Sequence, residues 1–277
     1  ALGKNDTNYF SDAMKLVDVS DIEVIVELIG GDTFARSLVI EALKKGKHVV
    51  TANKALLAKH GNEIFKVAED NGVTVGFEAA VAGGIPISKV LREGLTANSI
   101  EWIAGIINGT TNYILTEMES RGINFEKALK EAQDFGFAEA DPTLDIEGYD
   151  SAHKLALLAS MAFGTDLNLD KISVDGITNL DLKEVIYAKK LGYKIKSLGI
   201  ARRRKSGLEL RVHSTLIPAN CLMANVNGAM NAVLVKGNAV GDTLYYGQGA
   251  GAEPTASAVV ADLVDIARRT VGNQMNY

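Results

Sequence analysis

The sequence predicts a protein of the α/β plus α+β class that is built from two domains. Residues 23–78 alternate short β-branched apolar runs with segments of helical spacing, which is the pattern of βαβ units and a parallel sheet. From about residue 193, strand patterns follow one another without helices between them, which favours a second, mixed sheet. Of the 277 residues, 47% are hydrophobic and only 4 are proline, so the chain can bury a sizeable core without a proline-rich linker.

The first block is expected to contain three parallel strands joined by two helices. Residues 34–47 place apolar side chains at helical spacing and include Gly46 as a typical C-cap. The strand segments are short and rich in Val, as in sheets that are covered on both faces. The expected strands are 23–29, 48–52 and 73–78, and the expected helices are 34–47 and 55–72.

Beyond residue 78 the chain changes from alternating units to helices followed by strands. Paired glycines precede a helix within 79–95, and the last helix carries Pro254 near its first turn. The segment 109–122 is expected to turn away from the end of the strand 100–108. The other expected helices are 124–136, 150–164 and 254–270, and the later strands are 193–201, 208–217, 232–237 and 243–247.

The first block lacks the glycine-rich turn that opens a complete dinucleotide-binding fold, which begins with a strand, that turn and a helix. Residues 1–22 contain one glycine, Gly3, so no G-x-G-x-x-G precedes the first expected strand. We therefore expect a partial, N-terminally incomplete Rossmann-type domain, with most of the sheet but without the phosphate-binding turn.

Composition and charge exclude several classes of protein. A net charge of −5 argues against non-specific binding to nucleic acid or to an anionic membrane, and the basic run 202–205 is expected to be a solvated hairpin turn. The single Cys221 excludes an intrachain disulfide and a multi-cysteine metal site. Because the sequence has neither a run of about 18 apolar residues nor a signal-peptide profile, we expect a soluble, cytoplasmic protein.

Polar and glycine-bearing clusters follow the expected strands, at the sheet edge where open α/β folds bind ligands. Gly30 and Gly31 follow the first strand, and Lys54 follows the second. Lys54 can reach a cofactor or a substrate anion, or it can simply begin a helix. The loop 78–84 can supply oxygen ligands to a hard cation, or it can be a close-packed turn.

Residues 136–154 form the densest cluster of charged side chains. Asp150 and Lys154 are spaced i,i+4 and therefore share one face of the expected helix 150–164, whose remaining residues are strongly apolar. A lysine beside a carboxylate at the start of a buried helix can have a controlled proton affinity, although a surface ion pair gives the same spacing. The carboxylates before Lys154 are Glu139, Asp141, Asp145, Glu147 and Asp150.

Taken in order, these clusters resemble homoserine dehydrogenases. The resemblance rests on residues 48–54 (HVVTANK), 77–87, 105–115, 131–154 and 245–263, where a glycine-rich turn leads into the last helix. It implies an NAD(P)-dependent oxidoreductase that interconverts L-aspartate 4-semialdehyde and L-homoserine in threonine, methionine and isoleucine biosynthesis. It also implies a nucleotide-binding domain of residues 1–82 plus 250–277, and a catalytic substrate-binding and dimerisation domain of residues 83–249. Two features of the family are not found, the N-terminal G-x-G-x-x-G and a C-terminal ACT domain.

The resemblance assigns roles to individual residues. Aldehyde reduction needs a hydride donor and a proton donor for the developing alkoxide. Lys154 is the implied general acid–base, Asp150 orients its ammonium group, and Lys54 stabilises negative charge between nicotinamide and substrate. The other implied site residues are Glu139 and Asp145 for the substrate ammonium, Asn108, Gly109 and Thr110 along the substrate pocket, and Gly30, Thr51, Ala52, Lys54 and Gly251 for the nicotinamide half.

The resemblance further implies NADP or NAD as cofactor and a monovalent cation, Na⁺, near the hinge between the domains. Its implied ligands are Glu78, Val81, Gly83 and Ile85, mainly through backbone carbonyls. The segment 193–246 is the expected subunit interface of a homodimer or homotetramer.

Two rival functions remain compatible with the residues. A different oxidoreductase of small aldehydes or hydroxy acids would keep the two-domain layout, but would not need Glu139 and Asp145 for an ammonium group. A non-catalytic binding or regulatory homologue is favoured by the absent glycine-rich turn. Against it, such a protein has no reason to retain Lys54, Asp150 and Lys154 together with Glu139.

Overall fold

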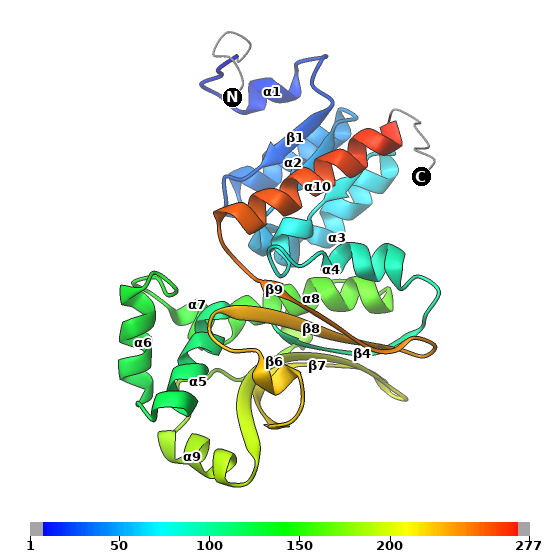
Figure 1. Cartoon of the computed structure of the whole chain (residues 1–277). Coiled ribbons are helices and arrows are strands. Elements are labelled where there is room, and N and C mark those ends of the chain that lie inside the picture. Colours follow the sequence, from blue (N-terminus) through cyan, green and yellow to red (C-terminus); the bar gives the residue numbers. More distant parts are fainter. Residues whose placement is uncertain (1–7, 271–277) are drawn as a thin grey trace.

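A computed structural model describes residues 8–270, and it divides into an upper and a lower part in Figure 1. The upper part holds a three-stranded parallel sheet in the order β1-β2-β3. Its elements are α1 (Met14–Val17), β1 (Val24–Glu27), α2 (Phe34–Lys44), β2 (His48–Thr51), α3 (Lys54–Asp70) and β3 (Val75–Gly76). The C-terminal helix α10 (Ala252–Thr270) returns to this part and packs against β2 and β3.

The lower part is built on a six-stranded mixed sheet in the order β5-β7-β6-β4-β8-β9. All neighbours pair antiparallel except β5 and β7, which are parallel. The strands are β4 (Ile100–Ile106), β5 (Ser173–Val174), β6 (Tyr193–Arg204), β7 (Gly207–Pro218), β8 (Met230–Gly237) and β9 (Gly241–Gln248). The predicted combination of a parallel sheet and a mixed sheet is confirmed.

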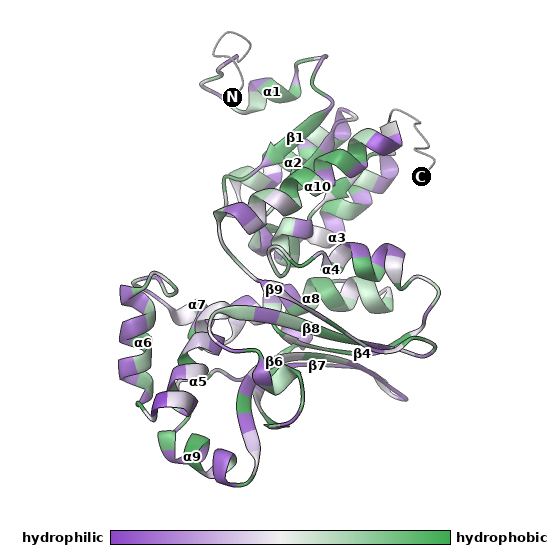
Figure 2. Ribbon diagram, in the orientation of Figure 1, coloured by the Kyte–Doolittle hydropathy of each residue, from purple (hydrophilic) through white to green (hydrophobic). Residues whose placement is uncertain are grey.

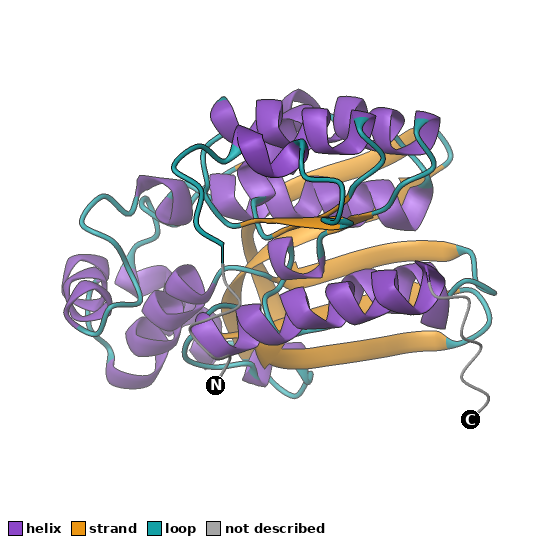
Figure 3. Ribbon diagram, turned by 90° about the horizontal axis from the view of Figure 1, so that it is seen from above, coloured by secondary structure: helices purple, strands orange, loops and turns teal. Residues whose placement is uncertain are grey.

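Helices cover one face and one end of the mixed sheet. The apolar helix α8 (Tyr149–Phe163) packs on β6 and β7, and seen from above the long helices run in much the same direction as the strands (Figure 3). At the end of the sheet, α5 (Gly109–Arg121), α6 (Phe125–Asp134) and α9 (Leu182–Lys190) share a smaller core. The remaining helices are the short α7 (Thr143–Ile146) and α4 (Ile87–Lys89), which continues as a π-helical turn over Val90–Gly94.

The main apolar core runs through both parts of the molecule. Buried side chains of α2 and α3 belong to the same cluster as those of α8 and of one face of the mixed sheet. In Figure 2 α8 carries mostly hydrophobic or neutral colours and α2 and α3 mix hydrophobic with hydrophilic ones, whereas α6 is hydrophilic along much of its length. Among the described residues no helix is long and apolar enough to cross a membrane.

Three local predictions differ from the structure. Residues 109–121 form the helix α5, which was not predicted because β-branched residues at its start are typical of strands. The side chain of Asn108 caps its start by accepting a hydrogen bond from Thr111 N, and Gly122 ends it in the left-handed region at φ 66°. The third predicted strand shortens to Val75–Gly76, because the chain enters a 3₁₀ turn at Glu78. The basic run lies mostly in β6, so the turn itself is only Lys205-Ser206.

Candidate active site

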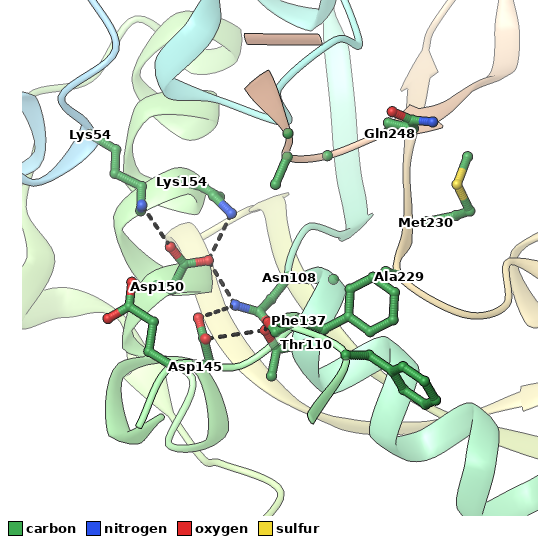
Figure 4. A pocket seen from close by; sticks show the side chains of 17 residues that line it. Lys54, Asn108, Thr110, Phe137, Asp145, Asp150, Lys154, Ala229, Met230 and Gln248 are labelled. Carbon is green, nitrogen blue, oxygen red and sulfur yellow. Dashed lines mark hydrogen bonds and ion pairs between the residues drawn. The ribbon is translucent and has the colours of Figure 1, made fainter. Parts of the chain in front are cut away.

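A cavity of about 740 Å³ lies where the upper part meets the mixed sheet, and Figure 4 shows the side chains around it. Its wall combines the start of α3, the first turns of α5 and α8, the loop between α6 and α7, and the start and end of the β8–β9 hairpin. The lining residues are Lys54, Asn108, Gly109, Thr110, Phe135, Gly136, Phe137, Glu139, Asp145, Asp150, Lys154, Ala229, Met230, Gln248, Gly249, Ala250 and Gly251.

Asp150 is the electrostatic centre of this cavity. Gly148, in the left-handed region at φ 86°, turns the chain into α8, so Asp150 and Lys154 lie one above the other on its first turns. The Lys154 Nζ donates to Asp150 Oδ2 at 2.7 Å, and the Lys54 Nζ lies 3.2 Å from Asp150 Oδ1. Burial alone would raise the pKa of Asp150, but the two ammonium groups outweigh it and hold that pKa well below its usual range.

The two lysines differ in how firmly they are held. Lys154 also donates to the carbonyl of Ile107 at 2.7 Å, and 11% of its side chain is exposed. Lys54, the first residue of α3, is 41% exposed and lines both this cavity and a smaller one on the side of the parallel sheet. Lys154 is therefore fixed at the floor of the site, while Lys54 reaches into the site from the opposite part of the molecule (Figure 4).

Asn108 and Thr110 hold a second carboxylate, Asp145, beside the first. The amide of Asn108 donates to Asp145 Oδ1 at 2.7 Å and to Asp150 Oδ2 at 2.9 Å, and Thr110 Oγ1 lies 3.1 Å from Asp145 Oδ2. Burial raises the pKa of Asp145, and the hydrogen bond from Asn108 opposes that shift. The site thus presents two adjacent carboxylates with pKa values moved in opposite directions, a feature common at sites of proton transfer.

The mouth of the cavity is aromatic on one side. Glu139 is exposed there, and Phe135 and Phe137 are exposed beside it. Phe137 packs on the Tyr113 ring with centroids 4.9 Å apart, and its carbonyl accepts a hydrogen bond from Thr110. Sequence reasoning did not select these phenylalanines, because a single aromatic in a loop has no periodic signal.

The smaller cavity, of about 450 Å³, lies at the carboxyl ends of β1 and β2. Gly30 and Ala52 line it, and Gly30 and Gly31 adopt φ values of 81° and 73°, which favour glycine. Thr51 is buried behind this wall, while Gly251 lies instead on the wall of the main cavity. An open glycine turn at this edge can accept a flat ligand closely against the backbone.

Glu27, which was not selected from the sequence, organises the smaller cavity. Its carboxylate is fully buried and accepts hydrogen bonds from Ile29 N at 2.8 Å, Gly30 N at 3.1 Å and Thr51 Oγ1 at 2.7 Å. These bonds tie the glycine turn after β1 to the end of β2. An acidic residue at the end of an apolar strand was the only available signal for this role.

The loop after β3 contains the predicted cation ligands. Glu78 is 2% exposed, burial raises its pKa, and its two carboxylate oxygens accept the amides of Ser88 and Lys89 at 2.7 and 2.9 Å. Within residues 8–270 no hydrogen bond reaches the carbonyls of Val81 or Gly83, whereas that of Ile85 accepts Ile87 N. The same residues contain no group of three or more His, Cys, Asp or Glu that could hold a metal ion.

Comparisons with known families match nearly the whole chain. Residues 86–264 match the family described as homoserine dehydrogenase, and residues 2–78 match the family described as homoserine dehydrogenase, NAD binding domain. The chain is 62% identical over 256 residues to the homoserine dehydrogenase of Pseudomonas aeruginosa, an alignment that covers 92% of this chain and 59% of that protein.

Solved structures give the same assignment. A homoserine dehydrogenase from Thiobacillus denitrificans superposes with a TM-score of 0.93 at 62% identity, over 95% of this chain and 61% of that one. A hyperthermophilic archaeal homoserine dehydrogenase in complex with NADPH superposes with a TM-score of 0.82 at 27% identity, over 94% of this chain and 76% of that one. The chain thus spans 59% of the Pseudomonas protein and 61% of the Thiobacillus chain.

Proposed function

This chain belongs to the homoserine dehydrogenase family, and from that membership we propose that it interconverts L-aspartate 4-semialdehyde and L-homoserine with NADP or NAD. The observation that carries the proposal is the carboxylate of Asp150 held between two ammonium groups at the floor of the main cavity. A nicotinamide supplies the hydride for reduction and accepts it in oxidation. The side chains of the site have to supply the proton and the binding energy.

Lys154 is the proposed general acid–base. In reduction its ammonium gives a proton to the oxygen of the aldehyde as the alkoxide develops, and in oxidation its amine removes the proton from the hydroxyl. Its contacts to Asp150 and to the Ile107 carbonyl support this role, because they fix the nitrogen and leave a hydrogen that can point into the cavity. Asp150 is the residue that orients Lys154 and offsets its charge.

Lys54 is proposed to stabilise the negative charge that develops on the substrate oxygen. Its position supports this role, because it lines both cavities and pairs with Asp150 across the two parts of the molecule. A preorganised positive charge beside a developing oxyanion lowers the barrier more in a partly dry cavity than in water.

The amino group of the substrate requires a carboxylate partner, and Glu139 and Asp145 are the proposed ones. Both line the main cavity, with Glu139 exposed at its mouth and Asp145 already held by Asn108 and Thr110. Gly109 lies between those two residues and leaves space at the same wall. If the residues at this wall were uncharged, the site would not distinguish the amino-acid substrate from a simple aldehyde.

The smaller cavity is the proposed site of the nicotinamide half of the cofactor. The glycine turn at Gly30 and the side chains of Ala52 and Thr255 leave it open toward Lys54, and Thr51 braces it through Glu27. Gly251, on the wall of the main cavity, would face the junction between cofactor and substrate. We propose the domain division at residues 1–82 plus 250–277 and 83–249, since α10 packs on the parallel sheet.

We propose that the loop after β3 binds a monovalent cation such as Na⁺. The carbonyls of Val81 and Gly83 support this, because no hydrogen bond reaches them within residues 8–270 and the buried carboxylate of Glu78 lies on the same short loop. The carbonyl of Ile85 would complete the set. The cation would order the crossing between the two parts and take no part in proton transfer.

We propose that the chain forms a homodimer or homotetramer through the open face of the mixed sheet. A groove of about 350 Å³ on that face is lined mostly by apolar side chains, including Trp102, Ile200 and Leu234, with Arg202, Glu209 and Arg211 beside them. Leu222, which is 75% exposed and follows β7 beside the groove residues Cys221 and Met223, adds to the apolar surface within the predicted segment 193–246. Contiguous apolar surface of this kind marks protein interfaces. The cytoplasmic location stays a prediction.

The proposal is tested by following the fall in NADPH or NADH absorbance when L-aspartate 4-semialdehyde is added to the protein. The matched control is succinate semialdehyde, which has the same chain length and carboxylate but lacks the amino group. We expect turnover of the amino acid and a kcat/KM for the control that is lower by on the order of 10²-fold, because Glu139 and Asp145 lose their partner. Equal rates would indicate a general aldehyde reductase, and no turnover of either would contradict catalysis by this chain.

A further inference from the structure

Lys196 is a buried lysine whose hydrogen-bond partners are all uncharged. It lies in β6, is 2% exposed, and its Nζ donates to the carbonyl of Val226 at 2.6 Å and to the side-chain oxygens of Asn112 at 3.0 Å and Asn227 at 3.3 Å. Burying an ammonium group is costly unless its hydrogens are bonded, and here all three are. A buried lysine of this kind is better explained by the geometry that its hydrogen bonds impose than by a contribution to stability.

The first consequence of Lys196 is to fix the orientation of Asn112. Lysine can only donate, so the oxygen of the Asn112 amide must face it and the amide nitrogen must face the other way. That nitrogen contacts the carbonyls of Val226 at 3.1 Å, Gly228 at 2.9 Å and Met230 at 3.0 Å. A single buried side chain of α5 therefore gathers three carbonyls of the segment 226–230.

Thr116, one turn further along α5, holds the same segment from its other side. Its hydroxyl accepts the amide of Gly228 at 3.1 Å and donates to the carbonyl of Asn112 at 2.7 Å. Gly228 has φ 62°, so the segment makes a tight turn at the point where both side chains hold it. The segment 226–230 is thereby attached to α5 through polar contacts rather than through apolar packing.

This segment forms a wall of the main cavity. Ala229 and Met230 line the cavity and lie on the side away from Lys54 and Asp150 in Figure 4. The Ala229 carbonyl comes so close to Gly109 that a Cβ there would meet it at 2.8 Å. The position of the segment is therefore coupled to the turn of α5 that carries the substrate-facing residues.

We propose that Lys196 is a positioning residue, which holds the segment 226–230 against α5 and so sets the width of the substrate cavity. Without its ammonium group the oxygen of the Asn112 amide loses the donor that it faces, and the carbonyl of Val226 loses its shortest hydrogen bond. The segment then moves away from Gly109, and Ala229 and Met230 no longer close the wall. The effect on substrate binding rests on the proposed function, whereas the effect on the segment does not.

Hydrogen–deuterium exchange of K196M tests the attachment without any substrate. The matched control is K194M, which removes a lysine two residues away on β6 that contacts Asn225 and Glu119 instead of Asn112. We expect exchange of the peptide containing 226–230 to accelerate by about tenfold in K196M, because local opening becomes easier, and to stay unchanged in K194M. Unchanged exchange in K196M overturns the proposal, and so does a uniform increase over the whole mixed sheet.

Steady-state kinetics test the link to the cavity. In K196M we expect KM for aspartate semialdehyde to rise about fivefold, the effect of losing roughly one hydrogen bond, with kcat and the cofactor KM close to wild type. Faster exchange with an unchanged KM overturns the role in substrate binding while leaving the proposed function intact. If K196M does not fold, the same two measurements are made on K196Q, which keeps a donating nitrogen on a shorter side chain. We expect faster exchange of the peptide containing 226–230 and a raised KM in K196Q as well. Wild-type exchange in K196Q overturns the need for the ammonium group.

Discussion

Replacement of Asp150 by asparagine removes one negative charge and keeps the shape of the side chain. One oxygen of Asp150 accepts from Lys154 at 2.7 Å and from Asn108 at 2.9 Å, and the other lies 3.2 Å from the ammonium of Lys54. Whichever way the new amide points, its NH₂ group faces a donor. The variant therefore loses both the charge and at least one hydrogen bond.

The expected loss follows from the burial of this pair. Removing one partner of a buried ion pair costs about 3–5 kcal/mol, because the remaining charge is left uncompensated. At about 1.4 kcal/mol per tenfold in rate, this predicts a fall in kcat of roughly 10²- to 4 × 10³-fold where the cost falls on the transition state. The reason is that Lys154 loses the group that orients its ammonium.

The assay compares D150N with D141N in initial rates of semialdehyde reduction. Asp141 belongs to the same acidic segment, but it is exposed, its side chain bonds only to Thr143 among residues 8–270, and it does not line the cavity. We expect D141N to match wild type, and both variants to show the far-ultraviolet circular dichroism of wild type. A folded D150N with wild-type kcat would refute the reasoning that Asp150 organises the site.

Three further predictions concern single side chains. K154A should lower kcat on the order of 10²–10⁴-fold and also lower the temperature of thermal unfolding, because the buried Asp150 carboxylate loses one of its two ammonium partners; wild-type turnover would remove Lys154 from the mechanism. E139A should mainly raise KM for homoserine, since it loses a charged contact of roughly 1.5–3 kcal/mol; a rise in the cofactor KM instead would move Glu139 to the cofactor side. Burial lowers the pKa of Lys196 from 10.5 to about 8, with Lys194 adding to the shift and Glu119 opposing it. The unfolded chain therefore binds more protons between pH 8 and 10.5, so the unfolding free energy of wild type should rise over that range relative to K196M, by roughly 3 kcal/mol in chemical denaturation; a constant difference would contradict this.

The fold could be predicted largely because its elements have local signals. The strand and helix pattern of residues 23–78 predicted the parallel sheet. The spacing of Asp150 and Lys154 placed both on one helix face, and in the structure Lys154 Nζ lies 2.7 Å from Asp150 Oδ2. The helix 109–121 was missed because its β-branched start resembles a strand. Its cap at Asn108 and its terminal Gly122 were the signals that could have identified it.

Other features depend on contacts between residues that are far apart in the sequence. From its position in the sequence, Lys54 was compatible both with a role in the site and with an ordinary helix start. The structure pairs it with Asp150, a contact that joins the two parts of the molecule. Glu27 and Lys196 were not selected, because Glu27 is a single acidic residue at the end of an apolar strand, Lys196 is one of several basic residues of β6, and the partners of both lie on other elements. Only the folded chain brings such partners together.

A crystal structure with L-homoserine bound tests the central assignment of the site most directly. We expect the substrate hydroxyl about 3 Å from Lys154 Nζ, and the ammonium group of the substrate against the carboxylates of Glu139 and Asp145. The account would be contradicted if the hydroxyl lay beyond hydrogen-bond distance of Lys154, or if the amino group of the substrate pointed toward Lys54.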